Sequence, residues 1–297
     1  MMQRRELLEW AGVAAGAAAM SGDALAASVV RAIAAGRAAA PVFTGPLGVQ
    51  LYTVRDLAKT DLAGVLASIS AIGYKEVETY WDVYNRPAKE LRAMIADHGL
   101  SVPSGHFDYE GLEAKIDYAR ELGAEYMICP MLPQKMWTSL DGFQAAAAQL
   151  NAWGEKVKQA GMQLGFHDHN YEFKRFGATT GFAELMRLTD PSLVVLEMDC
   201  YWITQAGQRP IEMLQKFGSR IRMLHLKDRP AGFATSQSLD DAASHFEAVG
   251  SGVIDWKSIL LMAQRTGVQH YFVERDSGFV PALQSLALSY KYLRSLE

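Results

Sequence analysis

The stretch Leu164-Gly165-Phe166-His167-Asp168-His169-Asn170-Tyr171-Glu172-Phe173 decides how this sequence of 297 residues is interpreted. A short apolar run leads into two histidines that stand two residues apart. Because side chains alternate between the two faces of a strand, His167 and His169 are predicted to point to the same side. Two imidazoles on one face of a strand end are typical of a metal or sugar site, but histidines beside a polar loop are often only solvated. The neighbouring strands must therefore decide between the two interpretations.

Short apolar segments alternate with helix-period segments from Leu47 to the C-terminus. Strands are predicted at 47–52, 76–80, 100–105, 126–129, 164–173, 193–199, 221–227 and 269–274. Helices are predicted at 62–72, 87–98, 112–122, 140–160, 182–188, 211–217, 256–266 and 280–295. Parallel strands need crossover helices, so this alternation predicts a parallel α/β fold, and eight units in about 250 residues fit a (β/α)8 TIM barrel. A doubly wound sheet is the alternative, but no Gly-x-Gly-x-x-Gly turn follows the first strand.

The N-terminal segment is predicted to lie outside the barrel. Arg4-Arg5 precedes an alanine-rich apolar run, and Ala24-Leu25-Ala26 suits a cleavage site, so residues 1–26 are predicted to be a Tat-type signal peptide. Residues 27–44 are interpreted as a linker and residues 45–297 as the barrel. The apolar run is too short and too broken to anchor the protein stably in a membrane. The predicted location is periplasmic or exported through the Tat route, and a leader helix that stays attached is the alternative.

Composition narrows the classes of partner. The net charge of −4 offers no basic face for nucleic acid, which needs positive charge to neutralise phosphates. The two cysteines, Cys129 and Cys200, are too few for a disulfide scaffold and are interpreted as buried free thiols, with a bridge between them as the alternative. A nucleic-acid partner is therefore not expected.

Ligand-type side chains follow most of the predicted strands, at the barrel end where this fold carries its chemistry. The predicted metal site takes one ligand from each of the last four strands: His167, Asp199, His225 and Glu274. Two imidazoles and two carboxylates suit a catalytic divalent ion, with Mn²⁺ expected and Zn²⁺, Co²⁺ or Fe²⁺ as alternatives. Charged residues that merely cap the barrel mouth are the other interpretation, which is common at one or two strands but not at four in succession.

A second group of residues at these strand ends is predicted to bind substrate. Gln50, Glu78 and His106 offer partners for sugar hydroxyls. The aromatic residues Tyr52, Trp81, Trp137 and Trp202 offer faces that suit a sugar ring.

Six segments together resemble the sugar phosphate isomerase/epimerase superfamily, the xylose isomerase-like TIM barrels. They are GVQLYTVR (48–55), FHDHNYEF (166–173), DCYW (199–202), HLKD (225–228), VGSGVIDW (249–256) and VERD (273–276). Ketose epimerases of this group bind a metal through Glu, Asp, His and Glu, and the last three match Asp199, His225 and Glu274. His167 stands in place of the first Glu, and Trp202 in place of a usual histidine. Because two glutamates exchange the substrate proton in those epimerases, these departures point away from a ketose 3-epimerase.

The His-x-His-x-x-Glu variant looks more like inosose dehydratase and the lyases or hydratases of 3-keto-glycosides. The resemblance implies a divalent-metal-dependent lyase, hydratase or isomerase that acts on a keto-sugar or 3-keto-glycoside through an enediolate. His169 or Lys227 is the predicted base, Glu172 or His106 the predicted acid or substrate ligand, and Glu274 is predicted to act in catalysis as well as to bind metal. A ketose 3-epimerase or isomerase and a non-catalytic carbohydrate-binding barrel are the alternatives. A homo-oligomer is a family expectation.

Overall fold

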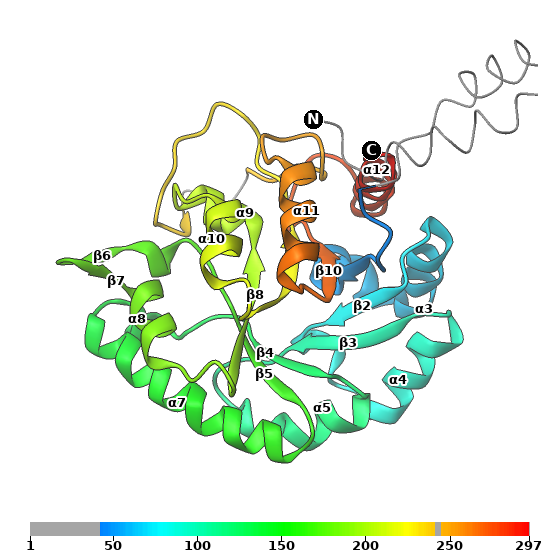
Figure 1. Ribbon diagram of the computed structural model, residues 1–297. Helices are drawn as coiled ribbons and strands as arrows, with labels where there is room; N and C mark the ends of the chain where they lie inside the picture. Colours follow the sequence, from blue (N-terminus) through cyan, green and yellow to red (C-terminus); the bar gives the residue numbers. More distant parts are fainter. Residues whose placement is uncertain (1–41, 241–244, 297) are drawn as a thin grey trace, which may run out of the picture. The chain divides into compact units, whose positions relative to one another are not determined.

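The alternation of strands and helices produces a closed barrel of eight parallel strands in the computed structural model, which describes residues 42–240 and 245–296 (Figure 1). The order around the barrel is β1-β10-β9-β8-β5-β4-β3-β2. The strands are β1 (Gly48–Gln50), β2 (Glu76–Thr79), β3 (Ser101–His106), β4 (Tyr126–Cys129), β5 (Gln163–His167), β8 (Val194–Asp199), β9 (Ile221–Leu226) and β10 (His270–Val273). The predicted (β/α)8 barrel is confirmed.

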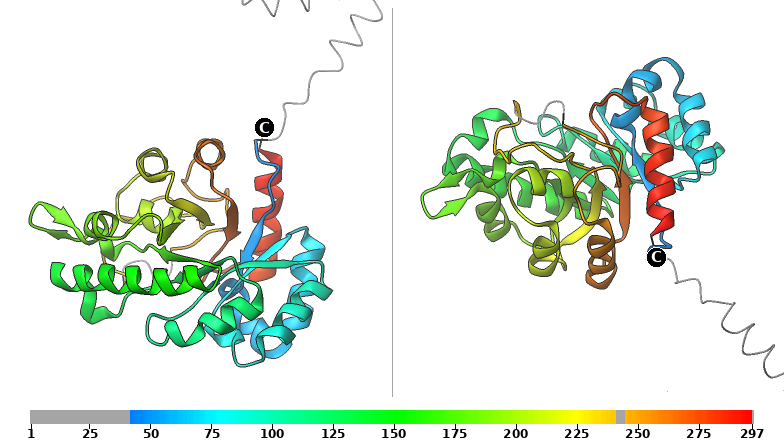
Figure 2. Two further views of the ribbon diagram at one scale, coloured as in Figure 1. Left: turned by 60° about the horizontal axis from the view of Figure 1, so that its bottom comes forward. Right: turned by 90° about the horizontal axis from the view of Figure 1, so that it is seen from above.

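A ring of helices surrounds the strands (Figure 1). Its main members are α3 (Arg55–Ile72), α4 (Ala88–Asp97), α5 (Ile116–Leu122), α7 (Leu140–Gln159), α8 (Gly181–Leu188), α10 (Pro210–Phe217), α11 (Trp256–Thr266) and α12 (Ala282–Ser295). The last helix, α12, packs against α3, and β10 pairs with β1, so the two ends of the repeat meet and close the barrel (Figure 2).

Short elements occupy the loops between the repeats. They are α6 (Gln134–Trp137), α9 (Cys200–Gln205), the hairpin of β6 (Arg175–Phe176) and β7 (Thr179–Thr180), and the 3-10 turns η2 (Leu51–Val54), η3 (Trp81–Val83), η4 (Glu113–Lys115) and η5 (Tyr171–Phe173). Most of them lie on the loops that follow strands, which are the loops that build the site in this fold.

The fifth strand ends earlier than predicted. β5 stops at His167, and the rest of the predicted strand forms a loop and η5. Side chains here satisfy backbone groups that a longer strand would have paired: Glu172 Oε2 accepts from the His169 backbone N–H at 2.9 Å. α3 begins at Arg55 and contains non-helical backbone at Asp61, just before the predicted helix 62–72.

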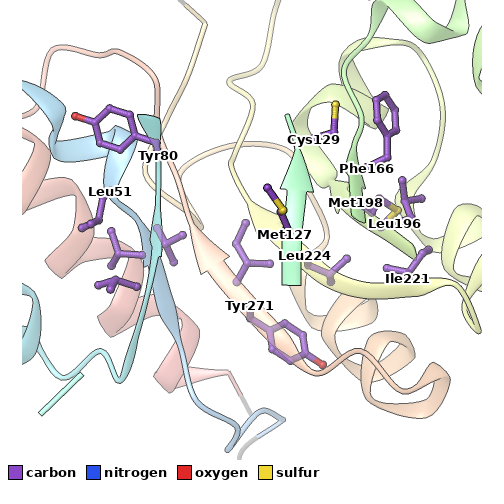
Figure 3. Packing of buried hydrophobic residues seen from close by; sticks show 14 of the residues in the cluster. Leu51, Tyr80, Met127, Cys129, Phe166, Leu196, Met198, Ile221, Leu224 and Tyr271 are labelled. Carbon is purple, nitrogen blue, oxygen red and sulfur yellow. The ribbon is translucent and has the colours of Figure 1, made fainter. Parts of the chain in front are cut away.

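Alternation along the barrel strands separates the side chains that face the helices from those that point into the barrel. Met127, Cys129 and Phe166 belong to the large core that the strands share with the helices (Figure 3). A smaller cluster of residues with the opposite parity forms an apolar plug, made of Tyr126, Ile128, Val195, Met223 and Phe272. The inward residues that follow this plug toward the strand ends are polar, and they form the floor of the site.

The predicted signal peptide 1–26 and most of the predicted linker 27–44 lie outside the described residues. The described part of the linker packs on the barrel, because Phe43 is buried with its ring centroid 4.5 Å from that of Tyr271. Among the described residues, no helix is long and apolar enough to cross a membrane. Cys129 and Cys200 are both buried and unpaired.

Candidate active site

The predicted metal ligands meet at the ends of β5, β8, β9 and β10. We call His167, Asp199, His225 and Glu274 the upper ligand set. His225 Nδ1 lies 3.0 Å from Glu274 Oε2 and 3.9 Å from Asp199 Oδ2, and His167 Nε2 lies 3.8 Å from the same Asp199 oxygen. Strand register brings them together, since Asp199 is the partner of His225 between β8 and β9.

The two oxygens of the Asp199 carboxyl have different roles. Oδ1 caps α9 by accepting from the backbone N–H groups of Tyr201 and Trp202 at 2.8 and 3.1 Å. Oδ2 is buried and accepts no hydrogen bond of good geometry, and the nearest cation is Lys227, with its Nζ 3.2 Å away. A buried carboxylate oxygen that faces two imidazoles and a second carboxylate fits a divalent cation by its donor chemistry.

Lys227 is the cation that the structure places beside these carboxylates. Its Nζ lies 2.7 Å from Glu274 Oε2, 2.9 Å from Asp276 Oδ1 and 3.2 Å from Asp199 Oδ2. Burial alone would lower the pKa of Lys227, but the three carboxylates outweigh it and raise that pKa well above its usual range. Lys227 is therefore an ammonium ion in this arrangement, which is the form that donates rather than accepts a proton.

A second group of ligand-type side chains lies toward the apolar plug. We call His106, His167, Glu197 and His225 the lower ligand set; their ligand atoms lie within 4.8 Å of one another and all four residues are buried. Glu197 Oε2 is 2.8 Å from His106 Nε2 and 2.9 Å from His167 Nδ1. The two sets share His167 and His225, each of which presents one ring nitrogen to each set.

Two predicted substrate ligands, Gln50 and Glu78, are fully buried and do not line the pocket. Glu78 accepts from His225 Nε2 at 2.6 Å and from Gln50 Nε2 at 2.8 Å, and the Ser104 hydroxyl donates to its other oxygen. Their polar atoms are thus used within the protein, where they orient the lower ligand set.

A pocket of about 250 Å³ opens above both sets. It is lined by Tyr52, Trp81, His106, Asp108, Pro130, Met131, His167, His169, Trp202, Lys227, Leu239, Glu274 and Asp276. Three of the predicted substrate ligands, Tyr52, His106 and Trp202, are among these lining residues. Tyr52 and Trp81 stand with ring centroids 5.5 Å apart, so aromatic faces and charged groups share one small cavity, as sugar pockets require.

His169 lies in the wall of this pocket, between Tyr171 and Trp202. Burial, reinforced by the nearby ammonium of Lys227, lowers the pKa of His169 well below its usual range. Its Nδ1 is buried without a hydrogen-bond partner. A neutral imidazole can accept a proton, which an ammonium ion cannot do.

Glu172 is placed behind His169 and not in the pocket. It is fully buried, and burial raises the pKa of its carboxyl to about 8. One oxygen accepts from the His169 backbone N–H. Glu172 therefore holds the His169 loop, and it does not reach the pocket as an acid or a substrate ligand.

Four pocket residues were not predicted to belong to the site: Asp108, Pro130, Met131 and Leu239. Asp108 follows the strand-end residue His106 by two positions, so the alternation rule could have found it. Met131 and Leu239 carry no such signal, because each depends on the path of a loop.

A second, outer cleft of about 640 Å³ adjoins the pocket and shares Met131 and Leu239 with it. Trp137 of α6 and Tyr171 form its aromatic side, with ring centroids 3.7 Å apart. Gln134, Lys174 and Gln237 provide polar edges. The pocket is smaller than the roughly 300–1,000 Å³ typical of sites for larger organic ligands, whereas the outer cleft lies within that range.

The fold and the site together define a TIM barrel whose strand ends carry His, Asp and Glu residues that could hold a metal ion. The chain matches the family described as xylose isomerase-like TIM barrel over residues 66–295, and it belongs to that family. It is 22% identical over 284 residues to an inosose dehydratase of Clostridium beijerinckii, which covers 84% of this chain and 94% of that protein.

Solved structures agree with the fold. A sugar phosphate isomerase/epimerase of Parabacteroides distasonis superposes with a TM-score of 0.72 at 24% identity, covering 88% of this chain and 97% of that one. An IolI protein with bound zinc superposes with a TM-score of 0.65 at 13% identity, covering 84% of this chain and 98% of that one.

Proposed function

We propose that this protein is a divalent-metal-dependent lyase or dehydratase that acts on a keto-sugar or 3-keto-glycoside. The observation that carries the proposal is the meeting, in one pocket, of a neutral His169, a charged Lys227 and buried imidazole and carboxylate ligands. The inosose dehydratase relatives and the zinc in the IolI structure support the same class.

The proposed reaction starts with removal of the proton beside the ketone. His169 accepts this proton, because its imidazole is neutral and lines the pocket. Lys227 donates a proton to the leaving oxygen on the β carbon, and Asp199 and Glu274 hold the ammonium in place. The C–H and C–O bonds break, a C=C bond forms beside the ketone, and the substituent leaves as an alcohol or water.

A bound divalent ion would be held by imidazoles and carboxylates of the two ligand sets. It would polarise the ketone and stabilise the negative charge that develops on its oxygen. The side walls formed by Tyr52, Trp81 and Trp202 exclude water and hold the sugar ring.

The outer cleft supports a glycoside over a free keto-sugar. The pocket holds a small ring, and the adjoining cleft offers room for a larger group attached to it. An aromatic side with polar edges suits a planar leaving group that carries hydroxyls.

The test is turnover of methyl and aryl 3-keto-glucosides by the purified protein in D₂O, followed by proton NMR. The expected result is deuterium exchange beside the ketone together with release of the alcohol. Lys227→Met should lower release by roughly 10²–10⁴-fold, the usual contribution of a proton-transfer group, while metal content stays unchanged. His169→Gln should lower exchange by a similar factor.

Other outcomes would point to the alternative functions. Exchange with inversion at carbon and no alcohol release would favour the epimerase. Binding without exchange would favour a carbohydrate-binding barrel. Full activity in Lys227→Met would remove Lys227 from the mechanism.

We also propose that the protein works outside the cytoplasm, on unphosphorylated substrates. Arg4-Arg5 and the alanine-rich run after it support export. Cell fractionation of the full chain and of an Arg4→Lys/Arg5→Lys variant tests this: the variant should stay in the cytoplasm.

A further inference from the structure

Two apolar side chains belong to both cavities of the site. Met131 and Leu239 line the pocket and also the outer cleft, so they mark the boundary between the two, and we call this pair the neck. Met131 lies on the loop after β4 and Leu239 on the segment between β9 and α11, so distant parts of the chain reach the same boundary. A thioether and a branched alkyl chain offer no strong hydrogen-bonding group, so the neck recognises a ligand by its size and shape.

An aromatic wall runs past the neck from one cavity to the other. In the pocket, the ring centroid of Trp202 lies 5.0 Å from that of His169. His169 stacks on Tyr171 with centroids 5.8 Å apart and an interplanar angle of 20°, and the Tyr171 centroid lies 3.7 Å from that of Trp137 in the outer cleft. Each ring thus neighbours the next across the boundary, so one ligand with two rings can pack along this wall.

The reactive groups lie on one side of the neck only. His169 and Lys227 line the pocket and not the outer cleft. A keto-sugar ring must therefore occupy the pocket for its proton to reach His169, and the leaving group attached to it must extend toward the cleft. The bond that breaks then lies beside Met131 and Leu239.

Hydrogen bonds to its backbone segment hold Leu239 at the boundary. The buried Asn170 donates from Nδ2 to the carbonyl oxygens of Ser236 and Ser238, each at 2.9 Å. The Leu239 side chain packs against an aromatic cluster that contains Trp202. Asn170 itself lines neither cavity, so loss of its two hydrogen bonds would release the segment that carries Leu239 without removing a pocket residue.

Met131 is held by the next residue of the same motif. The Tyr171 hydroxyl accepts a hydrogen bond from the backbone N–H of Leu132 at 3.0 Å, which fixes the residue beside Met131. The stretch 166–173 thus carries His169 and also holds both sides of the neck. The separation of the base from the neck is therefore set within one short segment.

We propose that Met131 and Leu239 select the leaving group of the substrate, and that Asn170 is a positioning residue that holds Leu239 for this selection. The inference deepens the proposed function and rests on the proposal that the substrate is a glycoside. The arrangement favours substrates whose leaving group is a ring, because a second ring extends past the neck onto Tyr171 and Trp137. A methyl leaving group ends before the neck.

The test is equilibrium binding of methyl β-D-glucoside and phenyl β-D-glucoside to the full-length protein, measured by calorimetry. Neither sugar has a ketone, so neither can undergo the proposed elimination. The phenyl preference is the Kd of the methyl glucoside divided by the Kd of the phenyl glucoside. It should be about 3–10-fold in the wild type, which is the contribution of one aromatic contact.

Tryptophan at either side of the neck should abolish this preference. Leu239→Trp and Met131→Trp each fill the neck and should lower the phenyl preference to below about twofold. Met131 is 37% exposed, so tryptophan fits there without disturbing the core. Leu261→Trp is the matched control and should keep the wild-type preference, because Leu261 on α11 is 38% exposed and lines neither cavity.

Asn170→Asp tests the positioning role. It keeps the size of the side chain but places a carboxylate oxygen against two carbonyl oxygens, so the phenyl preference should again fall below about twofold. Asn151→Asp is the matched control, because Asn151 Nδ2 donates to the Leu188 carbonyl oxygen at 2.9 Å and Asn151 lines neither cavity. A purely structural defect lowers the affinity for both glucosides equally, whereas loss of positioning changes their ratio.

Three results would overturn the assignment of the neck: a wild type that binds neither glucoside or shows no phenyl preference, retention of the preference in both tryptophan variants at the neck, or its loss in Leu261→Trp. A preference that persists in Asn170→Asp, or that is lost equally in Asn151→Asp, removes Asn170 from the proposal. A protein that shows the expected binding pattern but releases no alcohol from 3-keto-glucosides would reject the proposed function and leave the neck standing.

Discussion

At the scale of single residues, Glu172 links burial to pH dependence. Its folded pKa of about 8 lies above the value of about 4.3 in an unfolded chain, because burial penalises the carboxylate. Between these values the folded state binds the proton and the unfolded state does not. The stabilisation is therefore complete below about pH 4, shrinks as the pH rises, and is lost once the pH passes the folded pKa.

Glu172→Gln keeps the shape of the protonated side chain and cannot ionise. Its free energy of unfolding, relative to wild type, should rise with pH by up to about 1.4 kcal/mol per unit between pH 5 and pH 8. Urea unfolding of both proteins at pH 5, 6.5 and 8 measures it. Glu155→Gln, on the exposed side of α7, is the matched control for loss of a surface charge. A pH-independent difference between wild type and Glu172→Gln would contradict the assigned burial.

The sequence predicted which residues share a face of a strand, but not how far along the barrel axis each side chain lies. Alternation identified His167, Asp199, His225 and Glu274, and the structure brings them together. The same rule selected Gln50 and Glu78 as substrate ligands, yet they lie beneath the pocket, bound to each other. Parity along a strand does not state where the strand ends relative to its neighbours, since that depends on the stagger of the closed barrel. The ion pairs of Lys227 with Asp199, Glu274 and Asp276 depend on the same stagger, so the sequence did not predict them.

At the scale of elements, Asp228 ties the long segment between β9 and α11 to the barrel. Asp228 Oδ2 accepts from the backbone N–H groups of Gly250 and Gly252 at 2.8 and 3.1 Å and from Trp256 Nε1 at 2.8 Å. Gly252 is required at this approach, because a Cβ there would lie 2.2 Å from Asp228 Oδ1. The family segment from 249 to 256 thus has a structural role in fixing the loop.

Asp228→Asn should cost at least about 2 kcal/mol of unfolding free energy, because an amide in place of Oδ2 faces N–H donors and loses charged hydrogen bonds. Asp255→Asn is the matched control: Asp255 only caps α11, through Ser258 N at 3.1 Å, and asparagine caps about as well. Urea unfolding compares the two. Equal small losses would show that the loop is held by other contacts.

The outer cleft makes a prediction about α6. Trp137→Ala removes the aromatic side and should lower kcat/KM for an aryl 3-keto-glucoside by roughly 5–30-fold, equivalent to about 1–2 kcal/mol. The value for methyl 3-keto-glucoside should change less than about twofold, since a methyl group does not reach the cleft. Steady-state kinetics with both substrates measure the ratio. An equal loss for both would mean that Trp137 supports the pocket generally and selects no leaving group.

At the scale of the whole molecule, regular repetition made the barrel predictable and irregular loops limited the prediction. Eight strand–helix repeats are visible as apolar periodicity, and each strand was predicted within a few residues except the fifth. The segments β6 and β7, α6 and α9 escaped prediction because each is too short to show a period. The outer cleft therefore could not be predicted, whereas the floor of the site could.

Metal removal should weaken the entire barrel, because the ligand residues of both sets come from strands on different sides of it. An ion at about 100 times its Kd adds about 2.7 kcal/mol to the unfolding free energy. For a chain of this size, that corresponds to a melting temperature higher by roughly 5–10 °C. Calorimetry of the chelated and the Zn²⁺-reloaded protein measures the shift, and a His225→Ala variant, which lacks one of the two ligands common to both sets, should show none. A melting-temperature shift that persists in His225→Ala would place the stabilising ion elsewhere. If the shift is absent in that variant, the ion stabilises the barrel by joining ligand residues that come from different strands.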